Sequence, residues 1–502
     1  MRTMKTFAAV IAGAVLGLSA CKSLDAPDQN AATLQDLSGT PTLATISAAS
    51  QGLMAGMRAA GPCTGNCAYI GREGENLDPS NPQNVPTVYL IGGDFAVWAN
   101  SYANDKLANL VIAGVDKVVP ALTAPQVSAV KGFAKTVKAI DLMFVIQTTD
   151  VTGAVLDVPA NVTDSIPSVH SKAEVYARIF QLLDDAKTDL TNAGSTAFPF
   201  TFPAGFNGFT TPATFLTLNR AIKAREEVYF GNYAAALTDL TAAFSGGTFK
   251  AAPTSLADLN IGVYQTYSTT SGDLVNPVYD ATDRQRFAHN ELAQEAQLDS
   301  TAVGNDTTHR DARFLRKVRV SKTITNRYGF DVYWAFQVYN GQSDPIPLIR
   351  NEELILLRAE AELACTGAAP TPNCNGDRVS ALADINKIRN ISGKLKTIAA
   401  DPGLGGTKSG DLLLDELLYN KRYSLLWEGG YSWFDARKYG VLGNLNHGTF
   451  TGIPGDVVHN GDPTQVVFQY ARLPDNECNA RGIAINATAA GNGGPCQLAA
   501  GK

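Results

Sequence analysis

Residues 215–244, FLTLNRAIKAREEVYFGNYAAALTDLTAAF, constrain the fold most strongly, because they encode two helices with almost no chain between them. Gly231 and Asn232 interrupt the helical pattern, and Tyr229 and Tyr233 flank the interruption. Alanines recur where two antiparallel helices would pack closely. These features are typical of a tetratricopeptide-like helical hairpin. The segment therefore predicts a protein assembled from antiparallel helix pairs.

Several other long segments place apolar residues at three- to four-residue steps, as on one face of a helix. Before the hairpin, helices are predicted within residues 45–61, 94–116, 124–149 and 171–194. The last of these has a capping box at Ser171 and Glu174 and a stop at Gly194. After residue 345, helices are predicted within residues 349–364, 377–390 and 412–430. The last of these is expected to end at Gly429 and Gly430. One face of the 377–390 helix is predicted to carry Val379, Leu382, Ile385 and Ile388.

The middle of the chain differs from both flanks. Residues 245–345 are rich in Gly, Ser, Thr, Asn and Asp, and the segment TITNRYGFDVYWAFQVYNGQSDPIP has the β-branched and aromatic content of short strands broken by turns. The predicted fold class is mainly α, with tetratricopeptide-like hairpins under a loop-rich cap that carries a few short strands. We expect one integrated fold, with an N-terminal helical region at 41–250 and a C-terminal region at 251–502.

The first twenty residues predict a signal peptide. Arg2 and Lys5 precede the apolar run AAVIAGAVLGL, which is too short to span a bilayer. The run ends in Leu18-Ser19-Ala20-Cys21, which resembles the bacterial lipobox and implies that Cys21 is lipidated. The polar residues 21–40 are predicted to form a tether. The alternative is an ordinary secreted protein with a chance cysteine at this position.

Six further cysteines fall into three local pairs: Cys63 with Cys67, Cys365 with Cys374, and Cys478 with Cys496. An exported chain meets an oxidising compartment, where disulfides are expected. Six cysteines allow fifteen connectivities. Proximity favours the three local pairs, because each closes a short loop. A metal or redox site at CTGNC is the rival interpretation, but no second cysteine pair or histidine lies near it in the sequence.

The formal net charge of −6 and the absence of any basic run argue against nucleic-acid binding. The sequence lacks a G-x-S-x-G elbow, a phosphate-binding loop and a dinucleotide fingerprint. Its five histidines have no zinc-binding spacing. Neither a cofactor nor a metal site is predicted.

Residues 417–440, LLYNKRYSLLWEGGYSWFDARKYG, combine Glu428, Asp435 and Arg437 with tryptophan and tyrosine. Paired carboxylates beside aromatic rings are what a glycoside hydrolase needs. The same residues would also form an ionic lock between helices, because charge-assisted hydrogen bonds join elements strongly. We predict the lock, with Trp427 and Trp433 packed beneath it. Arg350 is likewise predicted to pair with Glu353 or Glu360.

The order of the C-terminal motifs resembles the SusD/RagB family of nutrient-binding surface lipoproteins. The motifs are DPIPLIRNEELILLRAEAELA, ALADINKIRN and NKRYSLLWEGGYSWFDARKYG. In the N-terminal half, VWANSYANDKLANLVIAGV, SKAEVYARIFQLLDDAKTDL and AREEVYFGNYAAAL are similar to helices of the same family. The sequence departs from the family at Asn420-Lys421, where Glu-Arg is frequent, and after the Glu-Gly turn at Tyr431 and Ser432. The ionic pairing around Glu428 and Asp435 is therefore expected to differ from the family's usual one.

The resemblance implies a protein that binds a nutrient and does not cleave it. The implied partner is a SusC-like TonB-dependent β-barrel transporter, and the implied location is the outer membrane, lipid-anchored and facing the cell exterior. An oligosaccharide is the expected ligand, with a peptide left open. The alternatives are a surface-anchored glycoside hydrolase and a structural helical-repeat lipoprotein.

Sugars bind to aromatic faces flanked by polar groups on loops. Two segments offer this mixture. Residues 70–95 supply Arg72, Asn76, Asp78, Asn81 and Tyr89, and residues 325–342 supply Arg327, Tyr328, Asp331, Tyr333, Trp334, Gln337 and Tyr339. Because side chains alternate along a strand, only one of Tyr333 and Trp334 faces a ligand. We expect Trp334 to face the ligand and Tyr333 to pack inward.

Overall fold

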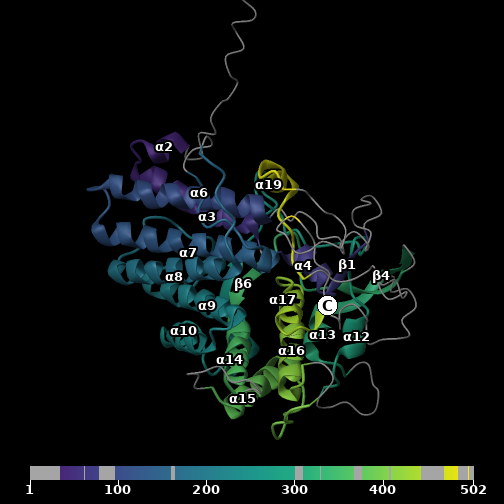
Figure 1. Ribbon diagram of the computed structural model, residues 1–502. Coiled ribbons are helices and arrows are strands. Elements are labelled where there is room, and N and C mark those ends of the chain that lie inside the picture. Colours follow the sequence, from purple (N-terminus) through teal and green to yellow (C-terminus); the bar gives the residue numbers. More distant parts are fainter. Residues whose placement is uncertain are drawn as a thin grey trace, which may run out of the picture.

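Antiparallel helices form the body of the protein in the computed structural model (Figure 1). The structure describes residues 34–61, 63–77, 97–159, 164–299, 309–327, 330–366, 376–405, 409–442 and 469–483, together with Cys496. In the N-terminal half each helix packs on the next, in the order α3 (Leu43–Ala60), α6 (Val97–Val115), α7 (Ala124–Thr149), α8 (Lys172–Ala193), α9 (Pro212–Phe230) and α10 (Tyr233–Ser245).

Local sequence signals set the ends of these helices, as predicted. At the start of α8 the Ser171 backbone N–H donates to Glu174 at 2.9 Å, which completes the capping box. The α9–α10 hairpin turns at Gly231, whose φ of 100° is a left-handed conformation that glycine adopts without a Cβ clash. The predicted hairpin of residues 215–244 is therefore confirmed.

The C-terminal helices pack directly on the N-terminal ones. Helix α14 (Asn351–Thr366) contacts α9, α10, α15 (Arg378–Ile388) and α16 (Leu412–Ser424), and α17 (Tyr431–Lys438) follows α16. Arg225 of α9 donates two hydrogen bonds to Glu353 of α14, at 2.5 and 2.6 Å, and both side chains are buried. A buried bidentate pair of this kind fixes the relative position of two helices. The two halves of the chain thus share one packed core.

Short elements form the cap beside this body (Figure 1). They are α4 (Thr64–Ile70), β1 (Gly74–Asn76), β3 (Arg286–Ala288), α12 (Glu291–Glu295), α13 (Ala312–Lys317), β4 (Val318–Arg327) and β5 (Phe330–Phe336). Three further short elements, α11 (Leu256–Leu259), β2 (Gly262–Gln265) and β6 (Ile346–Arg350), contribute buried residues to the core of the body. One sheet has the order β1-β3-β5-β4, and β2 pairs with β6. The predicted fold class, mainly α with a loop-rich cap and a few short strands, is confirmed.

Helix α16 ends earlier than predicted, at Ser424 rather than at Gly429. The reason lies in tertiary contacts of Trp427, whose φ is +65°. Its backbone N–H donates to the buried carboxylate of Glu73 at 2.8 Å, and its ring stacks on Phe336. These contacts hold residues 425–430 in a turn that no local signal encodes.

Two other expectations need correction. The end of the expected tether packs on the body, because α2 (Leu34–Ser38) buries Leu37 and the Ser38 carbonyl accepts from Lys117 at 2.7 Å. Val379, predicted on the apolar face of its helix, is 79% exposed, whereas Ala381, Ile385 and Ile388 face the core. Three-residue steps drift around a helix of 3.6 residues per turn, which moves Val379 off the buried face.

Disulfides join Cys63 to Cys67 and Cys478 to Cys496, as the local pairing predicted. Cys365 is also disulfide-bonded. Its predicted partner, Cys374, lies outside the described residues, as does Cys21. Within the described part of the chain, no helix is both long enough and apolar enough to span a bilayer.

Candidate functional site

The cap sheet brings together the two segments that the sequence predicted to bind ligand. Strand β1 ends at Asn76 in the first segment, and β5 lies in the second. Strand β3 joins them, because Phe287 is opposite both Glu75 of β1 and Ala335 of β5. Segments separated by more than two hundred residues therefore lie in one sheet.

Trp427 anchors this sheet to the helical body. Its ring stacks on Phe336 of β5 with centroids 3.9 Å apart, and its carbonyl accepts from the Tyr339 hydroxyl at 3.0 Å. Strand β1 passes so close that a Cβ at Gly74 would lie 2.8 Å from the Trp427 ring and 2.7 Å from Phe336. Only glycine fits such an approach. The predicted role of Trp427 as a packing residue agrees with this geometry.

The structure reverses the expected orientation of two aromatic residues. Tyr333 is 42% exposed, whereas Trp334 is partly buried and packs against Phe314 with ring centroids 5.4 Å apart. The predicted face assignment is therefore wrong. Phe314 on α13 provides the apolar surface on which the larger ring packs, and no sequence signal indicated that neighbour.

The remaining predicted ligand residues occupy different environments. Arg72 is buried with a φ of +56°, and Asn76 is paired with Arg286 in the sheet register. Tyr339 is buried, and Gln337 donates to the Leu315 carbonyl at 2.7 Å. Arg327 and Asp331 lie in β4 and β5, where only their backbones are described. The predicted residues outside the described part of the chain are Asp78, Asn81, Tyr89 and Tyr328.

Tyr339 lines a cavity of about 390 Å³ between the cap and the helical body, here called the cap cavity. Its walls come from α11, β2, α13, the β5–β6 connection and the turn after α15. The wall residues with polar groups include Asn260, Tyr264, Arg316, Tyr339, Asp344 and Ser392. Two tyrosine rings among hydrogen-bonding groups is the mixture expected of a site for a polyhydroxylated ligand.

A buried ionic network forms one side of the cap cavity. The Glu428 carboxylate accepts from Lys317 at 2.7 Å and from Arg350 at 2.8 and 3.0 Å. Arg350 also pairs with Glu352, which accepts from the Ser424 hydroxyl at 2.6 Å. The sequence-based prediction that Arg350 pairs with Glu353 or Glu360 is therefore wrong, because its partners are Glu352 and Glu428. Burial opposes ionisation of Glu352, but Arg350 and Ser424 outweigh it and lower its pKa to about 2.

This network does not supply the acid that glycoside hydrolysis requires. A glycosidase needs a carboxylic acid whose pKa is raised so that it is protonated near neutral pH. Glu352 has a lowered pKa, and two cations hold the Glu428 carboxylate. The chemistry that the cavity offers is hydrogen bonding and ion pairing.

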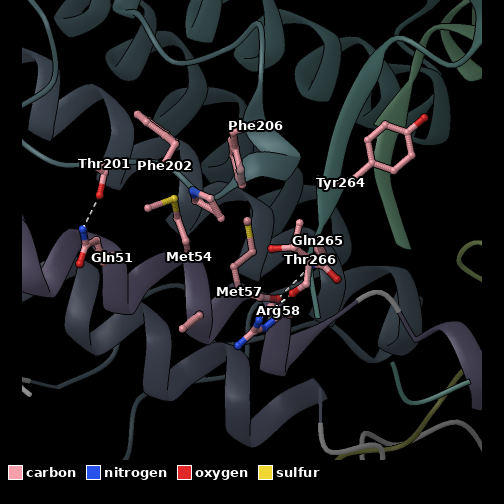
Figure 2. A pocket seen from close by; sticks show the side chains of 12 residues that line it. Gln51, Met54, Met57, Arg58, Thr201, Phe202, Phe206, Tyr264, Gln265 and Thr266 are labelled. Atoms are coloured by element: carbon pink, nitrogen blue, oxygen red, sulfur yellow. Dashed lines mark hydrogen bonds between the residues drawn. The ribbon is translucent and has the colours of Figure 1, made fainter. Parts of the chain in front are cut away.

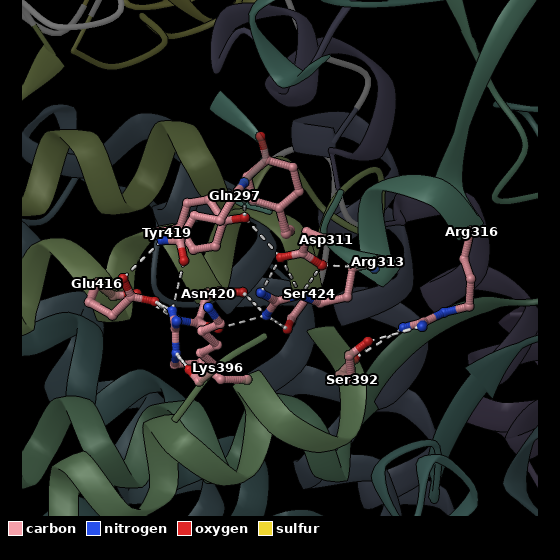
Figure 3. Close-up of polar contacts among 12 residues, drawn as sticks. Gln297, Asp311, Arg313, Arg316, Ser392, Lys396, Glu416, Tyr419, Asn420 and Ser424 are labelled. Atoms are coloured by element: carbon pink, nitrogen blue, oxygen red, sulfur yellow. Dashed lines mark hydrogen bonds and ion pairs between the residues drawn. The ribbon is translucent and has the colours of Figure 1, made fainter. Parts of the chain in front are cut away.

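A second network lies beside the cavity, centred on Arg313 (Figure 3). Its guanidinium binds the Asp311 carboxylate at 2.6 to 3.2 Å and donates to Asn420 and Ser424 at 2.8 and 3.0 Å. Tyr419 also donates to Asp311, at 2.8 Å. These contacts tie α13 of the cap to α16 of the body.

Asp435 and Arg437 belong to networks separate from that of Glu428. Lys421 bridges Asp435 at 2.5 Å and Glu360 at 2.7 Å, with all three side chains buried. Arg437 donates to the carbonyls of Gln147 and Gln469 and lies over the Trp433 ring. Lys421, at one of the positions where the sequence departs from the SusD/RagB pattern, is the cation that these two carboxylates share.

Sequence reasoning missed several residues of the cap cavity, among them Asn260, Tyr264, Arg316, Lys317, Glu352 and Ser392. The charged stretch 309–319, HRDARFLRKVR, was a signal that cations gather here. Nothing in the sequence showed that Ser392 and Tyr264 would lie opposite them. Within the described part of the chain, no group of three or more His, Cys, Asp or Glu side chains is arranged to hold a metal ion.

Another cavity, of about 290 Å³, lies between α3 and the segment 201–206 (Figure 2). Its floor is apolar, with Met54, Met57 and Phe206 buried. The polar side chains at its edge are already engaged, since Gln51 donates to Thr201 at 2.8 Å and Arg58 pairs with Asp273. It offers a sugar fewer free polar groups than the cap cavity does.

Comparison with solved structures identifies the fold. A SusD superfamily protein from Bacteroides vulgatus aligns over 87% of this chain and 97% of its own, with a TM-score of 0.62 and 15% sequence identity. A SusD-like carbohydrate binding protein from Bacteroides fragilis covers 86% and 98%, with a TM-score of 0.60 and 14% identity. A putative sugar binding protein from Bacteroides vulgatus covers 80% and 87%, with a TM-score of 0.54 and 19% identity.

No family model and no curated protein matches the sequence. The structural matches nevertheless extend over nearly the whole of each SusD-like chain, so the likeness is to the entire fold and not to one helical hairpin. The resemblance read from the sequence motifs is confirmed at the level of the fold.

Proposed function

We propose, from this SusD-like fold, that the protein is a cell-surface lipoprotein that captures an oligosaccharide and delivers it to a TonB-dependent outer-membrane transporter. The observation that carries the proposal is the match, over nearly the full length of both chains, to a solved SusD-like carbohydrate binding protein. The signal sequence and Cys21 support export and anchoring. The protein acts by binding, without cleaving the ligand.

The cap cavity is the proposed ligand site. Its tyrosine rings and free polar groups suit a sugar, and Tyr339 ties it to the ligand segment expected from the sequence. Arg72, Asn76, Asp78, Tyr89, Arg327, Tyr328 and Asp331 remain ligand residues predicted from the sequence. The other polar residues singled out in the sequence, Glu428, Asp435 and Arg437, serve the fold in this proposal, since each is held in a network between elements.

Calorimetric titration with a panel of soluble glycans tests the proposal. Tyr264 lines the cavity, and its hydroxyl donates to the Asn260 carbonyl at 2.5 Å. Tyr264→Ala removes a ring that stacks on sugar and is expected to weaken binding about ten- to a hundredfold, since 1.4 kcal/mol is a factor of ten. Tyr264→Phe keeps the ring and is expected to retain most of the affinity.

Two outcomes would count against this function. Release of product sugars from a bound glycan would replace binding with hydrolysis. Absence of binding across glycan and peptide panels would favour a structural lipoprotein. Purification from solubilised membranes tests the partner, because a large β-barrel protein is expected to copurify with the intact chain.

A further inference from the structure

Four cationic side chains line the cap cavity, and three of them are neutralised. Arg313 is paired with Asp311, Lys317 with Glu428, and Arg350 with both Glu428 and Glu352. These ion pairs lie at the junction of cap and body. The three carboxylates of Asp311, Glu352 and Glu428 balance the charge of the three cations, which therefore serve the fold.

Arg316 is the exception. It is solvent-exposed at the edge of the cavity, and no carboxylate of the described residues lies within 4.0 Å of it. Among the residues that the structure describes, its guanidinium donates only to Ser392, to the carbonyl at 2.9 Å and to the hydroxyl at 3.1 Å. In Figure 3 Arg316 points to Ser392, away from the acid–base cluster around Arg313. These two bonds hold the guanidinium in place and leave its other N–H groups available.

A guanidinium fixed in this way is suited to a carboxylate. Arginine presents five N–H donors in a planar fork that matches the two oxygens of a carboxylate. The cavity also contains one acidic group without a cationic partner among the described residues, Asp344, whose Oδ2 accepts from the backbone N–H groups of Asn340 and Gly341. Its other oxygen is left to accept from hydroxyl groups.

We propose that the oligosaccharide bound in the cap cavity carries a carboxylate, and that Arg316 recognises it. This inference rests on the proposed glycan-binding function and adds the class of sugar. Arg316 binds the carboxylate of a uronic or other acidic sugar residue, Ser392 holds the guanidinium in position, and Asp344 accepts from the sugar hydroxyls.

The test compares acidic oligosaccharides with the same molecules after methyl esterification of the carboxyl group. Three probes are titrated calorimetrically at pH 7: an oligogalacturonate, a glucuronate-containing oligosaccharide and sialyllactose. Wild-type protein is expected to bind at least one acid at least ten times more tightly than its ester, since hydrogen bonds to charged groups are the stronger ones. Arg316→Gln is expected to remove this preference, and Arg316→Lys to restore only part of it.

Lys322→Gln is the matched control. Lys322 lies on β4, close in sequence to Arg316, and donates to the Ala281 carbonyl outside the cavity. The Lys322→Gln variant also loses one positive charge, but it is expected to keep the preference for the acid over its methyl ester. Equal affinity of wild type for acid and ester, or an unchanged preference in Arg316→Gln, would overturn the inference. If the protein bound only neutral glycans, the carboxylate inference would be wrong and the proposed glycan-binding function would stand. If it bound no glycan, both the inference and the proposed function would be wrong.

Discussion

Glu226 illustrates, at the scale of a single residue, how burial couples this fold to pH. Its side chain is fully buried, and Gln147 donates to one carboxyl oxygen at 3.0 Å. The other oxygen has no hydrogen-bond partner in the described part of the chain. Burial raises the pKa of Glu226 to about 8. The folded protein therefore keeps a proton at this site at neutral pH, whereas the unfolded chain releases it near its ordinary pKa of 4.5.

The sign of the resulting pH dependence follows from proton linkage. Between about pH 5 and pH 8 the folded state binds more protons than the unfolded state, so this site lowers the free energy of unfolding as the pH rises. We expect Glu226→Gln to abolish this dependence. One proton bound only by the folded state changes the free energy of unfolding by about 1.4 kcal/mol per pH unit. Between pH 5 and pH 7.5 the free energy of unfolding of the wild type should therefore fall by about 2–3 kcal/mol more than that of the variant. Urea denaturation across this range measures the difference, and parallel pH profiles of the two proteins would contradict the prediction.

Tyr333 and Trp334 are neighbours with opposite roles in stability. Trp334 packs on Phe314, so Trp334→Ala is expected to cost about 2–3 kcal/mol, somewhat less than a fully buried tryptophan. Tyr333 is exposed, so Tyr333→Ala is expected to cost less than about 1 kcal/mol. Chemical denaturation of both variants is the measurement. A larger loss for Tyr333→Ala would mean that the two rings are assigned to the wrong faces.

At the scale of elements, the turn between α16 and α17 depends on a glycine for two reasons. Gly430 has a φ of +73°, and a Cβ there would lie 2.4 Å from the Cβ of Cys67 on α4. Gly231, in the α9–α10 hairpin, also has a positive φ, but a Cβ there would meet no atom within 4 Å. Substitution of Gly231 therefore measures backbone strain alone, whereas substitution of Gly430 measures backbone strain together with steric overlap.

We expect Gly231→Ala to cost about 1–2 kcal/mol, the strain of a left-handed alanine. Gly430→Ala carries the same strain and also displaces α4, so a loss of more than about 3 kcal/mol is expected. Thermal and urea unfolding of the two variants provide the comparison. Equal losses would show that α4 shifts away from the turn without cost.

The elements that the sequence predicted are those whose signals are local. Ser171, Glu174 and Gly194 mark both ends of α8, and Gly231 marks the hairpin. The end of α16 was missed because Glu73, far away in the sequence, holds the Trp427 backbone. The candidate site was only partly predicted for the same reason. Tyr339 was chosen by composition, but Arg316 and Ser392 meet only through the tertiary fold.

At the scale of the whole molecule, the proposed attachment to the membrane depends on Cys21, which precedes the described fold in the sequence. Cys21 follows the small-residue site Leu18-Ser19-Ala20 and is predicted to carry the lipid. Acyl chains contribute about 0.8 kcal/mol per buried CH₂, so Cys21→Ser should release the protein from membranes or leave the signal uncleaved. Membrane fractionation of this variant, with Ser23→Ala as the control, tests the anchor. A processed Cys21→Ser protein that stays tightly membrane-bound would exclude it.

The order of strands in the cap sheet has a consequence for how the chain matures. Strand β1 is synthesised early, but its partner β3 begins at Arg286 and depends in turn on β5. Contacts so distant in sequence form slowly, because the intervening chain must first lose much of its freedom. The helices of residues 97–245 make their most extensive contacts with their neighbours in sequence, so we expect them to form sooner. The cap sheet is thus expected to assemble last, on a body that is already folded.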